Sequence, residues 1–139
     1  MSALLPLEEA LARILSSVSR NPEVESVPLV QAVNRVLAQE VISAIDVPGE
    51  DNSAMDGYAL RAADAPGPLP ISQRIAAGAT GKMLAPGSAA RIFTGAAVPP
   101  GADAVVMQEN CIEQGGELEI QGEVLPGQNI RPRAQDIGA

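Results

Sequence analysis

Histidine and tryptophan are missing from this 139-residue sequence, and cysteine occurs only once. Without histidine, Ser-His-Asp and Cys-His catalysis, imidazole metal ligation and histidine-based pH switching are all excluded. The single cysteine, Cys111, excludes an intrachain disulfide and a cysteine-rich zinc site, and it fits a reducing compartment. Any bound metal would therefore meet carboxylate and backbone oxygens, which suit Mg²⁺ better than zinc.

Aromatic residues are almost absent as well, since Tyr58 and Phe93 are the only two. The core must therefore be built from Ala, Val, Leu and Ile. The chain also has almost no aromatic side chains on which the bases of a single-stranded nucleic acid could stack. Basic residues are few: 9 Lys and Arg stand against 17 Asp and Glu, which gives a net charge of −8. A negative chain repels the phosphate backbone, so we expect no nucleic-acid partner.

Long hydrophobic runs are also lacking. The longest uncharged run, 92–102, contains two prolines and is too short to span a bilayer. Glu8 and Glu9 lie where a signal peptide would carry basic and then apolar residues. We therefore expect a cytoplasmic protein that makes no use of a membrane.

The first part of the sequence has a helical pattern. Its apolar residues follow the i, i+3, i+4, i+7 spacing of an amphipathic helix: Leu7, Ala10, Leu11, Ile14, Leu15 and Val18. Pro6 suits the first helical position. We predict a helix from Leu7 to Val18, a second, shorter helix after Pro28, and extended chain over 36–47.

From residue 48 onward, glycine and proline recur every few residues and no helical period persists. Short strands are predicted at 91–94, 104–108 and 118–124, with Gly115-Gly116 as a hairpin turn. The predicted fold class is mainly β with short helices (α+β). An N-terminal helical segment would be followed by an irregular, barrel-like β-rich module.

The densest polar cluster is the segment Asp51-Asn52-Ser53-Ala54-Met55-Asp56, which Gly57 follows. Two carboxylates, an amide and a hydroxyl in one loop can hold a hard cation or orient a water molecule. The same residue types commonly form Asx turns, in which they only bond to the neighbouring backbone. The residues alone leave both interpretations open.

Two further groups of residues have the same ambiguity. Thr94-Gly95 opens a proline-stiffened loop whose N–H groups and hydroxyl could bind an oxyanion, or it is simply a turn between strands. Arg131 and Arg133, with Asp136, could grip a phosphate, or they are solvated surface. No Walker-type or paired-glycine nucleotide fingerprint is present.

Four runs taken together carry a family resemblance: 46–59, 91–101, 104–109 and 127–131. In this order they resemble the N-terminal region of the molybdopterin molybdenumtransferase family, which includes bacterial MoeA proteins and the C-terminal domain of gephyrin. Asp-Asn-Ser-Ala-Met-Asp-Gly-Tyr-Ala is the most specific of these motifs. The resemblance covers nearly the whole chain.

The resemblance implies an enzyme of the last step of molybdenum cofactor synthesis. Such a transferase cleaves adenylylated molybdopterin in a Mg²⁺-dependent step, releases AMP and places molybdenum from molybdate on the dithiolene. It also implies an elongated homodimer, with the active site between the β-rich domain of one subunit and the molybdopterin-binding domain of the other. Molybdopterin adenylyltransferase and acceptor molybdoenzymes are further partners that the resemblance suggests.

Carried over by position, the resemblance makes Asp56 and Thr94 catalytic, and Asp56 also a metal ligand. Substrate-binding positions follow in the same way: Asn52, Ser53, Gly95, Arg131, Arg133 and Asp136. The chain departs from the family at Ala134-Gln135-Asp136, where members usually have Gly-Glu-Asp. One acid of the family pattern is therefore missing.

The resemblance also predicts the domains. Residues 1–44 would be a helical dimerisation segment, 131–139 the start of its return segment, and 45–130 an inserted β-rich module. The downstream molybdopterin-binding and C-terminal domains of the family are absent from these residues, so we expect the chain to be inactive alone. The alternative is a non-catalytic dimerisation or binding module derived from the family.

Overall fold

The chain is seen in a computed structural model, which describes residues 5–19 and 23–139. By its internal contacts the chain divides into two units, residues 1–41 and 42–139. The finer domain boundaries expected from the sequence, after residues 44 and 130, stay predictions.

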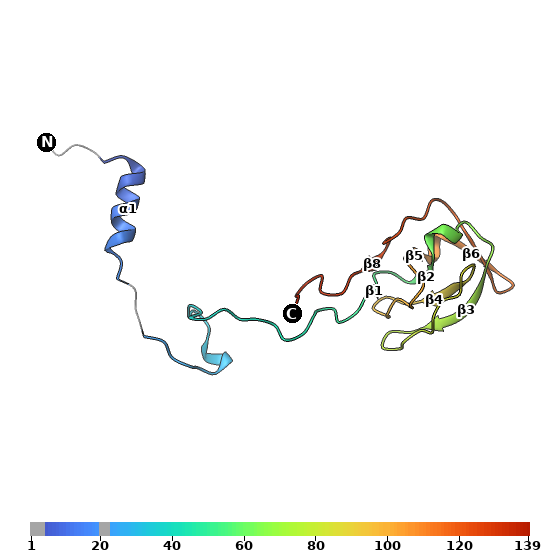
Figure 1. Ribbon diagram of the computed structural model, residues 1–139, viewed down its shortest axis with the longest axis horizontal. Helices are drawn as coiled ribbons and strands as arrows, with labels where there is room; N and C mark the ends of the chain where they lie inside the picture. The colour runs from blue at the N-terminus through green and yellow to red at the C-terminus, as the bar shows by residue number, and fades with distance from the viewer. Residues whose placement is uncertain (1–4, 20–22) are drawn as a thin grey trace. The chain divides into compact units, whose positions relative to one another are not determined.

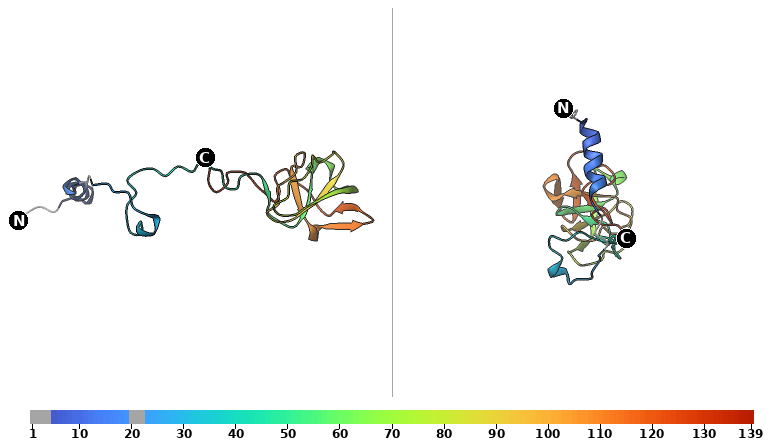
Figure 2. Two further views of the ribbon diagram at one scale, coloured as in Figure 1. Left: turned by 90° about the horizontal axis from the view of Figure 1, so that it is seen from below. Right: turned by 90° about the vertical axis from the view of Figure 1, so that its left-hand side faces the viewer.

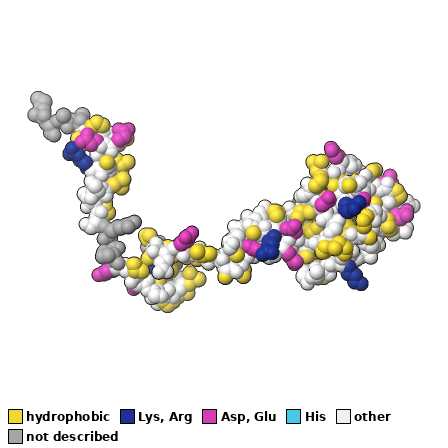
Figure 3. Space-filling view, in the orientation of Figure 1, with side chains coloured by type: hydrophobic (Ala, Val, Ile, Leu, Met, Phe, Trp, Pro, Cys, Tyr) yellow, Lys and Arg dark blue, Asp and Glu magenta, His cyan; other side chains and the backbone are white. Residues whose placement is uncertain are grey.

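The first unit contains helix α1 (Leu7–Ser17), which confirms the predicted helix. The backbone N–H of Ala10 donates to the Pro6 carbonyl at 2.9 Å. Two acidic residues lie in the first turn, where they interact favourably with the positive end of the helix dipole. No residue of α1 is buried within this chain, and hydrophobic side chains lie along one side of it (Figure 3).

The rest of the first unit has little regular structure. The expected second helix is only a single 3₁₀ turn, η1 (Leu29–Gln31), and residues 36–46 form no strand. The extended chain predicted there has no strand partner until Val47 bridges to Ile137. Among the described residues, no helix has both the length and the apolar character that crossing a membrane requires.

The second unit is built on a curled six-stranded sheet with the order β5-β2-β4-β3-β7-β6 (Figures 1 and 2). Its strands are β2 (Gly57–Leu60), β3 (Leu69–Ile75), β4 (Ala89–Ile92), β5 (Ala104–Met107), β6 (Cys111–Gln114) and β7 (Glu117–Ile120). Only β3 and β4 pair in parallel. A separate ladder joins β1 (Asn52–Ser53) to β8 (Ile130–Arg131). Single 3₁₀ turns complete the unit: η2 (Ala62–Asp64) and η3 (Gln108–Asn110). The predicted fold class is confirmed.

Several strands agree with the sequence and others were missed. The β6–β7 hairpin turns at Gly115-Gly116, where both residues have positive φ, as a tight two-residue turn requires. Strand β5 also lies where it was predicted. Strands β1, β2, β3, β6 and β8 were not anticipated. Strand β2 is buried at all four positions, so it lacks the alternation that identifies a half-buried strand.

The core lies on both faces of this sheet, because successive side chains of a strand point to opposite sides. One cluster of buried residues contains Tyr58, Leu60, Leu69, Ala89, Val106, Leu118 and Ile120. The other contains Ala59, Ile75, Leu84, Ala90, Ile92, Ala96 and Val105. Strands β2 and β4 lie between the two clusters, and this fixes the strand ends that carry the site.

Candidate functional site

Asp56 and Thr94 lie side by side, although 38 residues separate them in the sequence. Asp56 immediately precedes β2, Thr94 closely follows β4, and the two strands pair antiparallel with Gly57 opposite Ile92. The Asp56 Oδ1 atom accepts two hydrogen bonds from Thr94, one from the backbone N–H at 2.8 Å and one from the hydroxyl at 2.7 Å. The two residues predicted as catalytic therefore form one unit.

The environment of Asp56 favours its ionised form. The Thr94 N–H, followed by the Thr94 hydroxyl and the nearby charge of Arg91, lowers the pKa of this carboxyl below its usual 3.8. Both side chains are solvent-exposed. Among the described residues no hydrogen bond reaches Oδ2, so one carboxylate oxygen is open while the other is held in place.

This arrangement can orient a water molecule or donate one oxygen to a cation. The described residues contain no group of three or more acids or other ligand side chains that could cage a metal. Mg²⁺ is often held by only one or two carboxylates together with substrate phosphates and water. The exposed Asp56 oxygen could supply one such carboxylate ligand.

Ser53 has a mainly structural position. Its side chain is buried, its hydroxyl donates to the Met55 carbonyl at 2.6 Å, and it accepts from the Met55 N–H at 3.3 Å. This is the local turn that Ser commonly forms, and it shapes the chain that leads into Asp56. The Ser53 carbonyl also accepts the N–H of Gly95 at 2.8 Å, which ties the two loops together.

The first N–H groups of the Thr94-Gly95 loop are already used within the protein. The N–H groups of Thr94, Gly95 and Ala96 all donate to protein acceptors: Asp56, Ser53 and Phe93 respectively. Of the two interpretations of this loop, the strand-and-turn interpretation holds for these three groups.

Asn52 and Gly95 share a cavity of about 440 Å³ that sequence reasoning missed. It is also lined by Gly78, Ala79 and Thr80, which belong to a small-residue loop that follows β3. The sequence signal that could have indicated it is the run of small residues around Gly78. In the structure Gly78 has a positive φ of 79°.

The final segment, 131–139, turns back along residues 46–51. The backbone N–H groups of Ala134 and Asp136 donate to the Pro48 and Val47 carbonyls at 3.0 and 2.9 Å. Here Arg131 is ion-paired with Asp136.

Arg133 in the same segment is ion-paired with Asp46. Its backbone N–H also donates to Asp51 Oδ1 at 2.7 Å. Arg131 and Arg133 thus have separate acid partners. Asp51, the first acid of the polar cluster, holds the backbone of the final segment.

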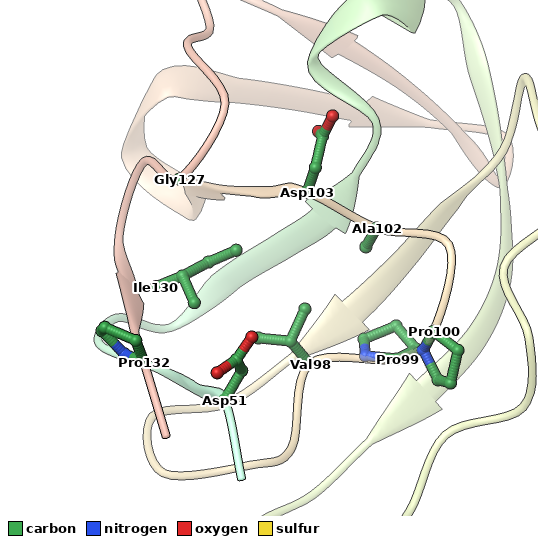
Figure 4. Close-up of a pocket in the computed structure, with 9 residues that line it drawn as sticks. All are labelled: Asp51, Val98, Pro99, Pro100, Ala102, Asp103, Gly127, Ile130 and Pro132. Carbon is green, nitrogen blue, oxygen red and sulfur yellow. The ribbon is translucent and has the colours of Figure 1, made fainter. Parts of the chain in front are cut away.

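A second cavity, of about 460 Å³, is lined by Asp51, Asp103 and three prolines among other residues (Figure 4). In this view the Asp103 carboxylate points away from Asp51. Each accepts a backbone N–H, from Arg133 and Ala62 respectively. The cavity therefore lacks convergent charged groups.

Comparison with known proteins identifies clear relatives. A sequence model of the MoeA N-terminal region, domains I and II, matches residues 5–139. A molybdopterin molybdenumtransferase of Haemophilus influenzae is 36% identical over 144 residues, which cover 96% of this chain and 34% of that protein. One from Nostoc sp. is 40% identical over 129 residues, which cover 87% and 30%. The crystal structure of a molybdopterin biosynthesis moeA protein from Pyrococcus horikoshii OT3 matches with a TM-score of 0.80 at 35% identity, covering 97% and 37%.

The chain spans about a third of the length of these curated relatives. The resemblance found in the sequence is thereby confirmed, and the structural match agrees with the mainly β fold.

Proposed function

The chain belongs to the family of the MoeA N-terminal region, and from this premise we propose that it forms one side of the active site of a molybdopterin molybdenumtransferase. The proposed activity is insertion of molybdenum from molybdate into adenylylated molybdopterin with release of AMP. The observation that carries the proposal is the pairing of Asp56 with Thr94 at the ends of two core strands.

In the proposed mechanism, Thr94 fixes one oxygen of the Asp56 carboxylate and leaves the other free to act on substrate. The exposed oxygen would orient the water that attacks the phosphate linkage, or it would be one ligand of a Mg²⁺ ion. Mg²⁺, when bound, would neutralise the charge of the phosphates. The lowered pKa of Asp56 keeps the carboxylate ionised at neutral pH, which both roles require.

The remaining substrate contacts belong to the same proposal. Asn52 and Gly95 would contact substrate in the cavity beside Thr94. Ser53 would act by holding the loop. Binding by the Arg131–Asp136 pair, or by Arg133, would require the present ion pairs to open or to be shared with substrate.

The proposal also includes the assembly and location of the enzyme. A homodimer is supported by the exposed apolar residues of α1, among them Leu7, Leu11 and Ile14, because contiguous exposed apolar residues commonly mark an interaction surface. A cytoplasmic location, a molybdopterin adenylyltransferase as supplier and molybdoenzymes as acceptors follow from the family's activity.

The test is Asp56→Asn in the complete protein encoded by the gene that carries these residues. Asn keeps the size and removes the charge, so AMP release should fall at least about tenfold. Thr94→Val, which removes only the hydroxyl, should lower the rate in the same direction. Glu119→Gln is the matched control, because Glu119 is an exposed acid on β7 outside the site, and it should leave the rate unchanged.

Rate and thermal midpoint are measured on the same preparations. A catalytic Asp56 predicts a lower rate per folded molecule with little change in the midpoint. A lower midpoint with an unchanged rate would mean that Asp56 serves only the turn, and the proposal would be abandoned.

A second candidate function is a non-catalytic dimerisation or binding module, which is favoured by Gln135 standing where the family usually has an acid. A chimera separates the two candidates: the 139 residues replace the matching segment of the Haemophilus influenzae relative. AMP release by this chimera supports the enzyme, whereas a folded but inactive chimera supports the module. The 139-residue chain alone should release no AMP above background.

A further inference from the structure

Two arginines occupy neighbouring positions across the sheet. In the strand register, Tyr58 of β2 lies opposite Arg91 of β4, and Arg91 lies beside Arg74 of the parallel strand β3. Side chains at paired positions share one face of a sheet. Like charges placed directly beside each other are destabilising, so this pair needs compensation or a purpose.

Phe93 supplies part of the compensation. The guanidinium carbons of Arg74 and Arg91 each lie 4.6 Å from the centre of its ring, and Arg91 also lies 5.1 Å from the Tyr58 ring. Both distances are within the range of a cation–π attraction. The two guanidinium groups are therefore separated by at most twice the distance to the Phe93 ring.

No carboxylate of the described residues forms an ion pair with either arginine. Five other arginines of the described residues do form ion pairs: Arg13, Arg35, Arg61, Arg131 and Arg133. Arg74, Lys82 and Arg91 form no ion pair with any described residue. In a chain of net charge −8, two adjacent cations that have no acid partner in the described part of the structure are conspicuous.

The two arginines differ in how they are held. Arg91 donates to the Gly57 carbonyl at 2.9 Å and to Gln108 Oε1 at 2.5 Å, which fixes its guanidinium group. The side chain of Arg74 is exposed and makes no hydrogen bond to any described residue. An arginine stacked on a ring keeps the N–H groups along its edge available, and these suit phosphate oxygens.

The pair also lies next to the proposed catalytic unit. Phe93 directly precedes Thr94, and Arg91 is close enough to act on the charge of Asp56. We propose that Arg74, Arg91 and Phe93 form a surface that binds a tetrahedral oxyanion beside Asp56 and Thr94. The inference rests on the proposed function, in which the oxyanion is a phosphate of the adenylylated substrate or molybdate. Arg74 contacts the anion, and Arg91 supplies charge from a fixed position.

The test uses the ¹⁵N-labelled 139-residue chain and follows the Nε–H resonances of Arg74 and Arg91. Pyrophosphate and molybdate are titrated separately at constant ionic strength. At least one of them should shift both resonances saturably, and Arg74→Gln should weaken its binding at least fivefold. Arg74→Lys keeps the charge but loses the planar guanidinium group, so its anion affinity should lie between those of the unchanged chain and Arg74→Gln.

Lys82→Gln is the matched control, because it removes another cation that forms no ion pair with a described residue. The described hydrogen bonds of Lys82 use only its backbone, which bonds to the Gln73 side chain. It should leave binding unchanged. No saturable shift with either anion, or equal weakening in Lys82→Gln, would overturn the inference. Saturation by molybdate alone or by pyrophosphate alone supports it and identifies the oxyanion.

This experiment measures binding and involves no turnover. Loss of AMP release in Asp56→Asn together with absent anion binding would leave the proposed function standing and remove only this surface. Anion binding that depends on Arg74, with unchanged AMP release in Asp56→Asn, would leave the surface standing and remove the assigned role of Asp56.

Discussion

Gly57 of β2 packs tightly against the backbone of β5, and replacing it with alanine should strongly destabilise the second unit. A Cβ atom at this position would lie 1.9 Å from the Val106 carbonyl oxygen and 2.8 Å from its carbonyl carbon. Real Cβ contacts stay above 3.0 Å, and both neighbours are backbone atoms, so no side-chain rotation relieves the clash. The two strands would have to separate by about 1 Å.

The cost can be estimated from this geometry. Overpacking in a core costs about 1–3 kcal/mol, and each weakened ladder hydrogen bond adds about 1 kcal/mol. A loss of about 3 kcal/mol is therefore expected, which is a large part of the roughly 5–15 kcal/mol that holds a typical domain together. For a unit of this size the thermal midpoint should fall by about 12–24 °C.

The assay is thermal unfolding of the chain, followed by circular dichroism. Gly49→Ala is the matched control, because a Cβ atom at Gly49 would have no other atom within 4 Å and the φ of this residue is not positive. It should unfold within about 0.5 kcal/mol of the unchanged chain. If Gly57→Ala unfolds within about 4 °C of Gly49→Ala, the close approach of β2 and β5 is not as described, and the reasoning fails.

Two further predictions concern titratable groups. Burial raises the pKa of Cys111 to about 11, so only about one thiol in a thousand is ionised at pH 8. Alkylation by iodoacetamide should therefore be slow until the chain is unfolded. Rapid alkylation of the folded chain would contradict this. The Arg61 side chain, then the Gly87 N–H, lowers the pKa of Asp64 below 3.8. Its stabilising contribution is therefore present above pH 3.8 and lost as the pH falls toward the folded pKa. At pH 7 the thermal midpoint of Asp64→Asn should lie below that of the unchanged chain, and the difference should disappear in acid. A difference that does not depend on pH would refute the stabilising role of the ionised Asp64.

Local patterns in the sequence were sufficient for several elements. The i, i+3, i+4 spacing of apolar residues predicts α1, and the glycine pair at 115–116 predicts the β6–β7 turn. Both depend on interactions between residues close together in the chain, which the order of residues encodes directly. Asp56 and Thr94 entered as site residues through the family resemblance, because neither carboxylate spacing nor turn chemistry distinguishes a catalytic loop from a capped turn.

Strand pairing was beyond what local patterns encode. Strand β2 is buried on both faces and short, so its four residues carry no period that would reveal it. Its position between β4 and β5 is what brings Asp56 to Thr94 across 38 residues, and what makes glycine necessary at position 57.

The sequence by itself therefore determined the composition of the core, the helix, the hairpin and the motif that marks the family. Only the tertiary structure decided that the Ser53 hydroxyl holds a turn. It likewise decided that Arg131 is ion-paired with Asp136, while Arg74 has no such partner among residues 5–19 and 23–139. It also decided that Arg74 lies beside Arg91, because parallel pairing of β3 with β4 sets that register. The physical reason is that local conformation follows from neighbouring residues, whereas the partners of a charged side chain depend on the order of strands in the sheet.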